Sequence, residues 1–356
     1  MVLAVLMPLA AARAGGAPGV LILSPSGTNA GAYTLASWSA DGGKEIATFN
    51  NQVWYGADED SAAFLQLKSQ TETRLLVVDR KTLAVVADKT LEGFGAWPLH
   101  RNVAESLAVR SKDSVVYFNG FDPQRSFGFT EANWKTGEAH PIPSTPHPSV
   151  IYTDALIALP AGFAWVGPGR TVVLYDEASR RELPPAADPA GYDRNQARQV
   201  YYVPTLGLME YYMGSHRQLT DASFRPAGPQ AQTFPSTEMI TRVFVRNTQG
   251  RPFLIWGENK DADAGRYPEK GVKEIVIVDA ASGKVVLRKP LGGDFSRSIQ
   301  PNPDGTKIYL FQPETGEIFC LDRDTETISP FARTQPDPKT APRSVDGWNF
   351  AMVAAN

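Results

Sequence analysis

The sequence has very little cysteine, and this excludes several kinds of site. Cys320 is the only cysteine among 356 residues, so no disulfide can form within the chain. Zinc sites built from several cysteines and cysteine-rich redox scaffolds are excluded for the same reason. The neighbours of Cys320, namely Ile318, Phe319 and Leu321, are apolar. They predict a small buried side chain in a strand rather than a catalytic thiol.

Metal-binding patterns are also lacking. The four histidines show neither an HExxH motif nor a pair four residues apart; they are His100, His140, His147 and His216. Two acidic groups, 58–60 and 261–263, do not match the calcium-binding loop with its closing glutamate. We therefore expect no metal centre, and we interpret the acidic groups as solvated loops.

The common signatures of catalysis and of polyanion binding are missing as well. The chain has no G-x-S-x-G elbow, and Ser215-His216 has no evident acid to orient it. Its paired glycines lie at a leader junction or in expected turns, not in phosphate-binding loops. A net charge of −3 without a basic cluster argues against a nucleic-acid partner. No catalytic residue and no cofactor site are predicted in this chain.

One long apolar segment stands at the start of the chain. Residues 1–14 form an apolar run that ends in Ala12-Arg13-Ala14, a pattern read by signal peptidase. No lysine or arginine precedes the run, which leaves open a longer leader, and a buried N-terminal strand or helix is the alternative. No other segment approaches the roughly 20 apolar residues of a membrane helix. We expect an exported product without membrane insertion, folded as one domain over residues 15–356.

The sequence does contain a repeated motif, which consists of an apolar strand, an Asp or Asn, a short turn and a second strand. Its six polar markers lie 43 to 58 residues apart, at Asp79, Asn133, Asp176, Asp221, Asp279 and Asp322. This spacing is close to the roughly 40–50 residues of a four-stranded propeller blade. With one more blade closed by the two chain ends, the sequence predicts an all-β, seven-bladed β-propeller with few helices. A pair of β-sandwiches is the rival architecture.

Turn chemistry supports the repeat. An Asp at a strand end can accept hydrogen bonds from the backbone two residues further on. Asp41-Gly42 and Asp304-Gly305 are hairpin signals that we place before inner strands. The closing strand is either 20–23 or the tail around 348–350. Long polar or proline-rich stretches predict loops at 138–149, 184–199, 258–270 and 336–343.

Aromatic residues are the remaining candidates for a binding surface. They are Trp38, Trp54-Tyr55, Tyr201-Tyr202 and Tyr211-Tyr212. Aromatic side chains supply large contact areas at interfaces, but in strands they more often pack between blades. We expect a core role for each.

Two stretches of the chain resemble a known family. The first stretch begins at Asp41-Gly42, continues through Val53-Trp54-Tyr55 and ends with the strand and turn at 74–83. The second stretch begins at 253–256, continues through 273–284 and ends at 303–305. In order and spacing they resemble the heavy subunit of methylamine and aromatic amine dehydrogenases, over about two thirds of the chain. That subunit is a periplasmic seven-bladed propeller.

The resemblance implies a supporting role in amine oxidation. In that family a small disulfide-rich light subunit carries tryptophan tryptophylquinone, oxidises a primary amine and passes electrons to a cupredoxin or a c-type cytochrome. The heavy chain contributes a Phe within a Gly-Gly-Phe-Leu phrase near the active-site entrance. Here the matching stretch is Ala30-Gly31-Ala32-Tyr33, so Tyr33 is the residue that the resemblance places in a substrate channel.

Two hypotheses of function follow. The first is a periplasmic heavy subunit that needs a light-subunit partner. The second is a secreted propeller that binds a protein or small ligand and catalyses nothing. An independent hydrolase or lyase, with active-site residues drawn from separate blades, is the third possibility.

Overall fold

The computed structural model describes most of the chain in segments. The described residues are 19–26, 31–39, 42–96, 103–124, 127–142, 156–166, 172–178, 181–183, 197–203, 208–213, 216–220, 239–240, 244–248, 251–259, 271–279, 282–295, 299–312, 315–333 and 351–355. The predicted signal peptide, 1–14, lies outside them. Within the segments given, the regular structure is all β, and no helix is long and apolar enough to cross a membrane.

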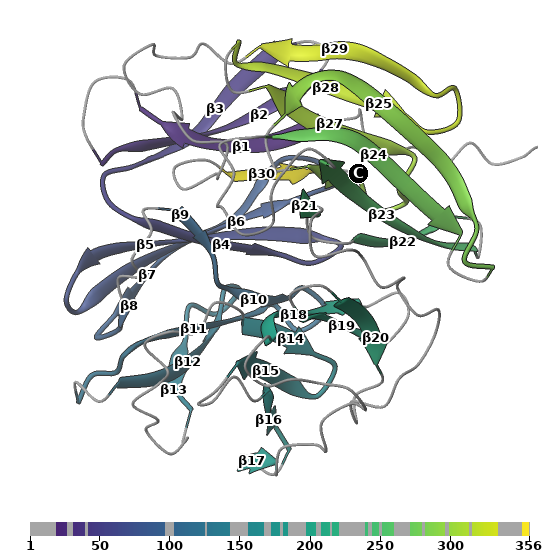
Figure 1. Cartoon of the computed structure of the whole chain (residues 1–356). Coiled ribbons are helices and arrows are strands. Elements are labelled where there is room, and N and C mark those ends of the chain that lie inside the picture. The colour runs from purple at the N-terminus through teal and green to yellow at the C-terminus, as the bar shows by residue number, and fades with distance from the viewer. Residues whose placement is uncertain are drawn as a thin grey trace, which may run out of the picture.

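The strands of the described residues pair into seven sheets, numbered here in chain order (Figure 1). The first contains β1 (Gly19–Pro25), β2 (Tyr33–Ser39), β3 (Gly42–Phe49) and β30 (Ala351–Ala354). The second contains β4 (Val53–Ala57), β5 (Ser61–Ser69), β6 (Glu72–Asp79), β7 (Val85–Glu92) and β9 (Val103–Glu105). The third contains β8 (Gly95–Ala96), β10 (Ala108–Arg110), β11 (Val115–Phe121), β12 (Phe127–Asn133) and β13 (Ala139–Pro141).

The later sheets follow the same plan. The fourth contains β14 (Leu156–Leu159), β15 (Gly162–Val166), β16 (Val172–Asp176) and β17 (Arg181–Leu183), and the fifth β18 (Ala197–Val203), β19 (Leu208–Met213) and β20 (His216–Thr220). The sixth contains β21 (Met239–Ile240), β22 (Phe244–Thr248), β23 (Arg251–Asn259), β24 (Val272–Asp279) and β25 (Val285–Phe295). The seventh contains β26 (Gln300–Pro301), β27 (Lys307–Gln312), β28 (Glu317–Asp322) and β29 (Thr327–Arg333).

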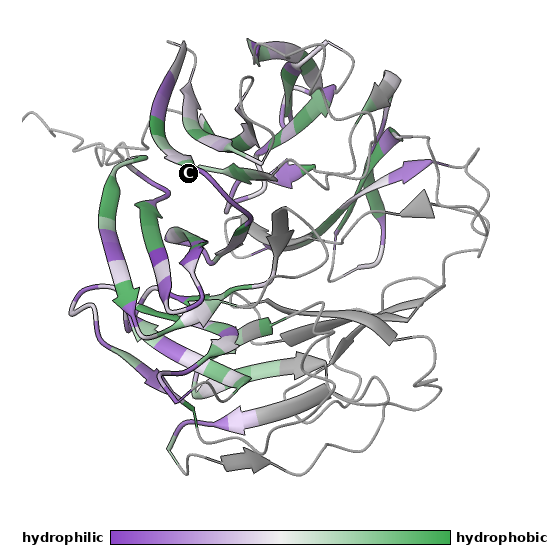
Figure 2. Cartoon of the chain, turned by 90° about the vertical axis from the view of Figure 1, so that its left-hand side faces the viewer, coloured by the Kyte–Doolittle hydropathy of each residue, from purple (hydrophilic) through white to green (hydrophobic). Residues whose placement is uncertain are grey.

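Middle strands of several sheets, such as β6, β11 and β24, are buried on both faces. In β6 the consecutive residues Leu75, Leu76, Val77 and Val78 are all at most 1% exposed. Successive side chains of a strand point to opposite faces, so an unbroken buried run requires a neighbour on each face of the sheet. Figure 2 shows that apolar and hydrophilic residues are mixed along other strands.

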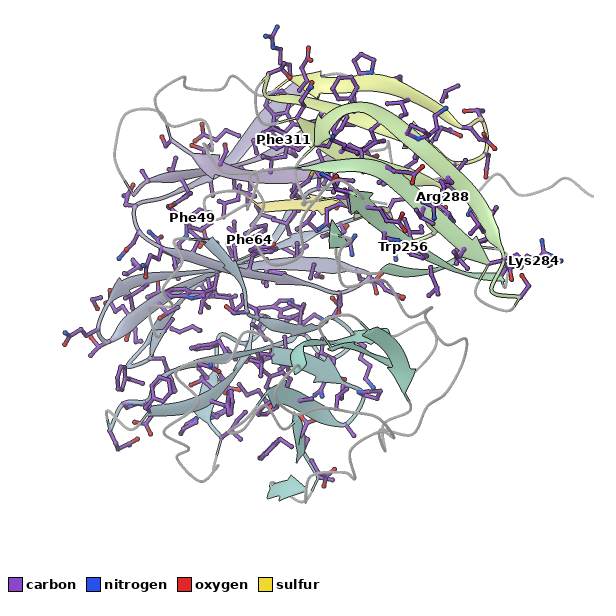
Figure 3. All side chains as sticks on the ribbon, in the orientation of Figure 1. Phe49, Phe64, Trp256, Lys284, Arg288 and Phe311 are labelled. Atoms are coloured by element: carbon purple, nitrogen blue, oxygen red, sulfur yellow. The ribbon has the colours of Figure 1, made fainter. Side chains whose placement is uncertain are left out.

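Most neighbouring sheets pack against each other through apolar clusters. Phe49 of the first sheet meets Phe64 of the second, with ring centroids 6.4 Å apart (Figure 3). Other clusters join the second sheet to the third, the third to the fourth and the sixth to the seventh. Strand β14 of the fourth sheet contacts β18 of the fifth. Fully burying one such aromatic or aliphatic side chain contributes about 1.5–3 kcal/mol, so these contacts fix the order of the sheets.

The seventh sheet packs against the first. Ile22 and Met352 of the first sheet pack with Tyr309 and Phe311 of the seventh. Within the first sheet β1 pairs antiparallel with β30, so 20–23 lies beside the C-terminal strand. Both ends of the described chain therefore contribute to one sheet. The segment 348–350, the other predicted closing strand, lies outside the described residues.

The predicted Asp and Asn turns are confirmed at four places. The side-chain Oδ1 atoms of Asp79, Asn133, Asp279 and Asp322 each accept backbone N–H hydrogen bonds from the turn that follows. Asp176 ends β16 at the equivalent place, and Asp221 lies outside the described residues. The repeat read from the sequence is thus the turn between the third and fourth strands of a sheet.

Two details of the expected organisation were wrong. The hairpin after Asp41-Gly42 leads to β3, which forms an edge of the first sheet instead of an inner strand. The stretches 138–149, 184–199 and 258–270 were expected to be loops, but the first contains β13, which pairs with β12, and the other two include the start of β18 and the end of β23. Both errors arise because a hairpin signal or a proline marks a turn without specifying the strand's place in its sheet.

The edge strands carry features that hinder pairing with another chain. A β-bulge interrupts the pairing of β3, β7, β25 and β29 with their neighbours. Bulges and edge residues such as Lys89, Lys289 and Pro330 hinder pairing with another chain. Val86 and Val286, at the bulges in β7 and β25, are 52% and 51% accessible.

Candidate functional site

A buried cluster of charged side chains lies across the sixth sheet. Glu258, at the end of β23, is 2% exposed and accepts a hydrogen bond of 2.8 Å from the indole Nε1 of Trp256. Its other carboxylate oxygen lies 2.6 Å from Nη1 of Arg288 on β25. Arg288 also pairs with Glu274 on β24. We call these four residues the Glu258 cluster; Trp256 and Arg288 are labelled in Figure 3.

The strand register explains how the cluster forms. Trp256 pairs with Val276 and Glu258 with Glu274 across β23 and β24, while Val276 pairs with Arg288 on β25. Alternate residues of β23 share a face, so Trp256 and Glu258 point to one side, and Ile255 points to the side that packs on the seventh sheet. The cluster therefore occupies the face of the sixth sheet opposite to the seventh.

The electrostatics of the cluster favour ionised groups. The hydrogen bond with Glu258 raises the pKa of the Arg288 guanidinium further above its usual value. Burying an ionised carboxylate is costly unless it is paired, and Glu258 has both a cationic and a neutral donor. The Glu274 and Arg288 side chains are 18% and 37% exposed, so solvent reaches this side of the cluster.

The end of β23 is anchored close to the cluster. Asn259 is 1% exposed and donates a hydrogen bond of 2.6 Å from Nδ2 to the carbonyl of Gly271. This bond joins the two ends of 260–270, most of the stretch predicted to be a charged loop. The cluster thus lies beside the hydrogen bond that joins the end of β23 to the residue before β24.

A second set of polar contacts crosses between sheets two, three and four. The Asp58 carboxylate accepts hydrogen bonds of 2.6 Å from both the backbone N–H and the hydroxyl of Ser111. The neighbouring Arg110 donates to both carboxylate oxygens of Glu177, at 2.9 and 2.8 Å. Asp58, predicted to lie in a solvated loop, instead holds two sheets together. Residues 261–263 of the other acidic group lie outside the described residues.

Tyr33 begins β2 and is buried. It pairs with Pro25 and Phe49, is 2% exposed and packs in the cluster between the first and second sheets. Its role in a substrate channel stays a prediction. The structure does not bring Tyr33 together with the Glu258 cluster, which belongs to the sixth sheet.

The other candidates from the sequence are distributed over several sheets. Trp54 is 3% exposed in the cluster between the second and third sheets, as expected for a core residue. Tyr55 and Trp38 are partly buried against neighbouring clusters. The tyrosine pairs 201–202 and 211–212 lie on the paired strands β18 and β19 but not opposite each other: Tyr201 pairs with Glu210, and Tyr211 with Val200.

Cysteine and histidine show no clustering in the described part of the chain. Cys320 lies on β28 and is partly buried, and burial raises the pKa of its thiol to about 11. His140 is exposed on β13, and His216 begins β20. His100 and His147 lie outside the described residues. No group of three or more potential metal ligands occurs among the residues searched, which are the described ones.

Comparison with known proteins identifies the fold but no family. No protein-family model matches the chain, and no curated protein matches its sequence. Among solved structures, the periplasmic gluconolactonase PpgL of Pseudomonas aeruginosa is similar, with a TM-score of 0.56 over 95% of this chain and 99% of the other, at 11% identity. This chain has a β-propeller-like fold.

Two further structures agree. Citrobacter koseri AztD matches the propeller with a TM-score of 0.52 and 11% identity over 95% of this chain and 98% of the other. A putative 6-phosphogluconolactonase of Bacteroides fragilis NCTC 9343 gives 0.53 and 10% over the same shares. Identities this low support a shared fold only. They do not support the resemblance to amine dehydrogenase heavy subunits, which we treat below as a proposal.

Proposed function

We propose that this chain is an exported, seven-bladed β-propeller that acts as a binding scaffold for a positively charged group on a partner. The observation that carries the proposal is the Glu258 cluster. It combines a buried carboxylate, paired with an indole N–H and a guanidinium, with a second carboxylate on the same guanidinium that solvent reaches. Such an arrangement holds two carboxylates in a fixed geometry, where a cationic group on a partner could contact the exposed one.

The seven blades are inferred from the seven sheets of the described residues and their order of packing. Each sheet would be one blade, and the sheet that contains β1 and β30 would close the ring. Export is supported by the apolar leader at 1–14 and by the periplasmic origin in the name of the similar gluconolactonase.

A second candidate is the heavy subunit of a periplasmic amine dehydrogenase. It is favoured by the two stretches that carry the resemblance, which fall on the first, second, sixth and seventh sheets. In that role Tyr33 would line the substrate channel. The partners would be a disulfide-rich light subunit with tryptophan tryptophylquinone and a cupredoxin or c-type cytochrome acceptor.

One experiment separates these candidates. The protein is isolated under mild conditions from the periplasm of its native host, and the mass, visible spectrum and activity of the preparation are recorded. The scaffold proposal predicts a colourless complex with a stoichiometric partner and no amine-dependent dye reduction. A small cysteine-rich companion with a chromophore bleached by primary amines would establish the second candidate. A lone chain that hydrolyses a sugar lactone would overturn both.

A pair of variants then tests the site itself. Glu274→Gln removes the charge of the partly exposed carboxylate. Because Glu258 still pairs with Arg288, the sheet should fold as before. Losing one charge-assisted contact should weaken partner binding by roughly tenfold or more. Glu92→Gln, an exposed change on β7 of the second sheet, is the matched control. Equal affinity of both variants for the partner would place the binding surface elsewhere.

A further inference from the structure

The side chain of Arg80 connects two sheets that are distant in the sequence. Arg80 follows the turn residue Asp79 in the second sheet and is 5% exposed. Its Nε and Nη2 atoms donate hydrogen bonds of 2.8 and 2.6 Å to the carbonyl oxygen of Ala354, at the end of β30 in the first sheet. Its Nη1 atom donates to the carbonyl oxygen of Asp58. One guanidinium thus bridges the C-terminal strand and the second sheet.

The strand that Arg80 contacts is short and lies at an edge. β30 contains four residues and, among the strands of the described residues, pairs with β1 alone. The N–H of Ala355 continues the pairing with a hydrogen bond of 2.8 Å to the carbonyl of Gly19. A four-residue edge strand makes few backbone hydrogen bonds, so two charge-assisted bonds at its end form a large share of what holds it.

The position of the guanidinium is itself fixed by other groups. The Asp58 carboxylate accepts hydrogen bonds from the N–H groups of Asp60 and Ser61 in its own turn, at 3.1 and 2.9 Å. It also accepts the two bonds from Ser111 of the third sheet. The carbonyl of Asp58 therefore presents a rigid acceptor. The N–H of Arg80 donates to the carbonyl of Asp60 at 2.8 Å, which fixes the base of the side chain.

We infer that Arg80 is the latch that holds the C-terminal strand in the first sheet. The consequence is that local opening of β30 is controlled by a side chain of the neighbouring sheet as well as by pairing with β1. This inference is independent of the proposed partner site, because it concerns a different face and different residues.

The seventh sheet supplies a matched comparison. Arg323 follows Asp322 just as Arg80 follows Asp79, and its N–H donates to the carbonyl of Thr306 at 3.0 Å. Its guanidinium contacts Asp324 and stacks over the Phe253 ring of the preceding sixth sheet, 4.9 Å from the centroid. Arg323 occupies the same place in its sheet, but these contacts join it to Asp324 and Phe253 and not to β30.

Hydrogen exchange of the full chain tests the latch. In Arg80→Met the amides of 351–355 should exchange about tenfold faster or more than in the wild type, because two charge-assisted bonds are lost. Those of the sixth and seventh sheets should be unchanged. Arg323→Met should leave 351–355 unchanged. Unaltered exchange of 351–355 in Arg80→Met, or an equal increase in every sheet, would overturn the inference.

A second variant keeps the test decisive if Arg80→Met folds poorly. Arg80→Lys retains the charge but lacks the planar fork that donates twice to one carbonyl. Its exchange at 351–355 should lie between those of the wild type and Arg80→Met. Exchange in Arg80→Lys identical to that of the wild type would show that the paired donation has no role, which contradicts the latch.

Discussion

Phe163 offers the sharpest test of how the sheets pack. It lies on β15 in the fourth sheet with no exposed surface. Its ring centroid is 4.9 Å from that of Tyr117 and 5.0 Å from that of Phe129, both in the third sheet. Tyr175 of its own sheet lies 5.0 Å away. The perturbation is Phe163→Ala, which removes the ring that connects all three.

The expected loss can be estimated from these contacts. Truncating a buried Phe to Ala usually costs about 3–5 kcal/mol, through lost burial and the cavity that remains. Each aromatic pair contributes roughly 0.5–1.5 kcal/mol beyond its buried area, and three pairs are lost, so we expect the upper part of that range. Since a folded domain is stable by about 5–15 kcal/mol in total, Phe163→Ala should remove a third or more of the free energy of unfolding.

Urea unfolding measures this loss. Purified Phe163→Ala and wild-type protein are compared by tryptophan fluorescence and circular dichroism. Val86→Ala is the control, because Val86 is 52% exposed and its truncation should change the free energy of unfolding by less than about 0.5 kcal/mol. A loss below about 1 kcal/mol for Phe163→Ala would refute the packing of the third sheet on the fourth.

Three further predictions use other contacts. A Cβ atom on Gly56 would lie 2.2 Å from a backbone carbonyl oxygen, so Gly56→Ala should lower the urea midpoint strongly; Gly128→Ala, with nothing within 4 Å, should change the free energy of unfolding by less than about 1 kcal/mol. The hydrogen bond from Lys307 lowers the pKa of Asp322 to about 2, below its unfolded value of about 3.9. The stabilisation is thus complete above about pH 4 and is lost as the pH falls toward 2, and Lys307→Met should flatten the urea midpoint across that window. With a thiol pKa of about 11, Cys320 should react with an alkylating reagent at pH 8 far more slowly in the folded protein than in urea.

The repeat and its turns could be predicted from the sequence because they depend on neighbouring residues. Asp79 and Asp322 each accept hydrogen bonds from N–H groups two and three residues further on. A short polar side chain at a strand end produces this turn wherever it occurs. The period of the turns then predicts the number and order of the sheets.

The polar sites could not be predicted because their members are far apart in the sequence. Glu258 meets Arg288 30 residues later, and Arg110 meets Glu177 67 residues later. Arg80 and Ala354 are separated by 274 residues. No local pattern specifies such pairs; they depend on which sheets become neighbours. The one local pattern shared by these charged residues is an Arg directly after the turn Asp, at Arg80 and Arg323.

The most direct test of the proposed scaffold is a hydrogen-exchange comparison of the chain with and without the partner isolated from its native host. The account predicts slower exchange in the bound state at 256–259 and 272–274, around the Glu258 cluster. Protection confined to the turns at the other end of the sheets, such as 79–84, would contradict it.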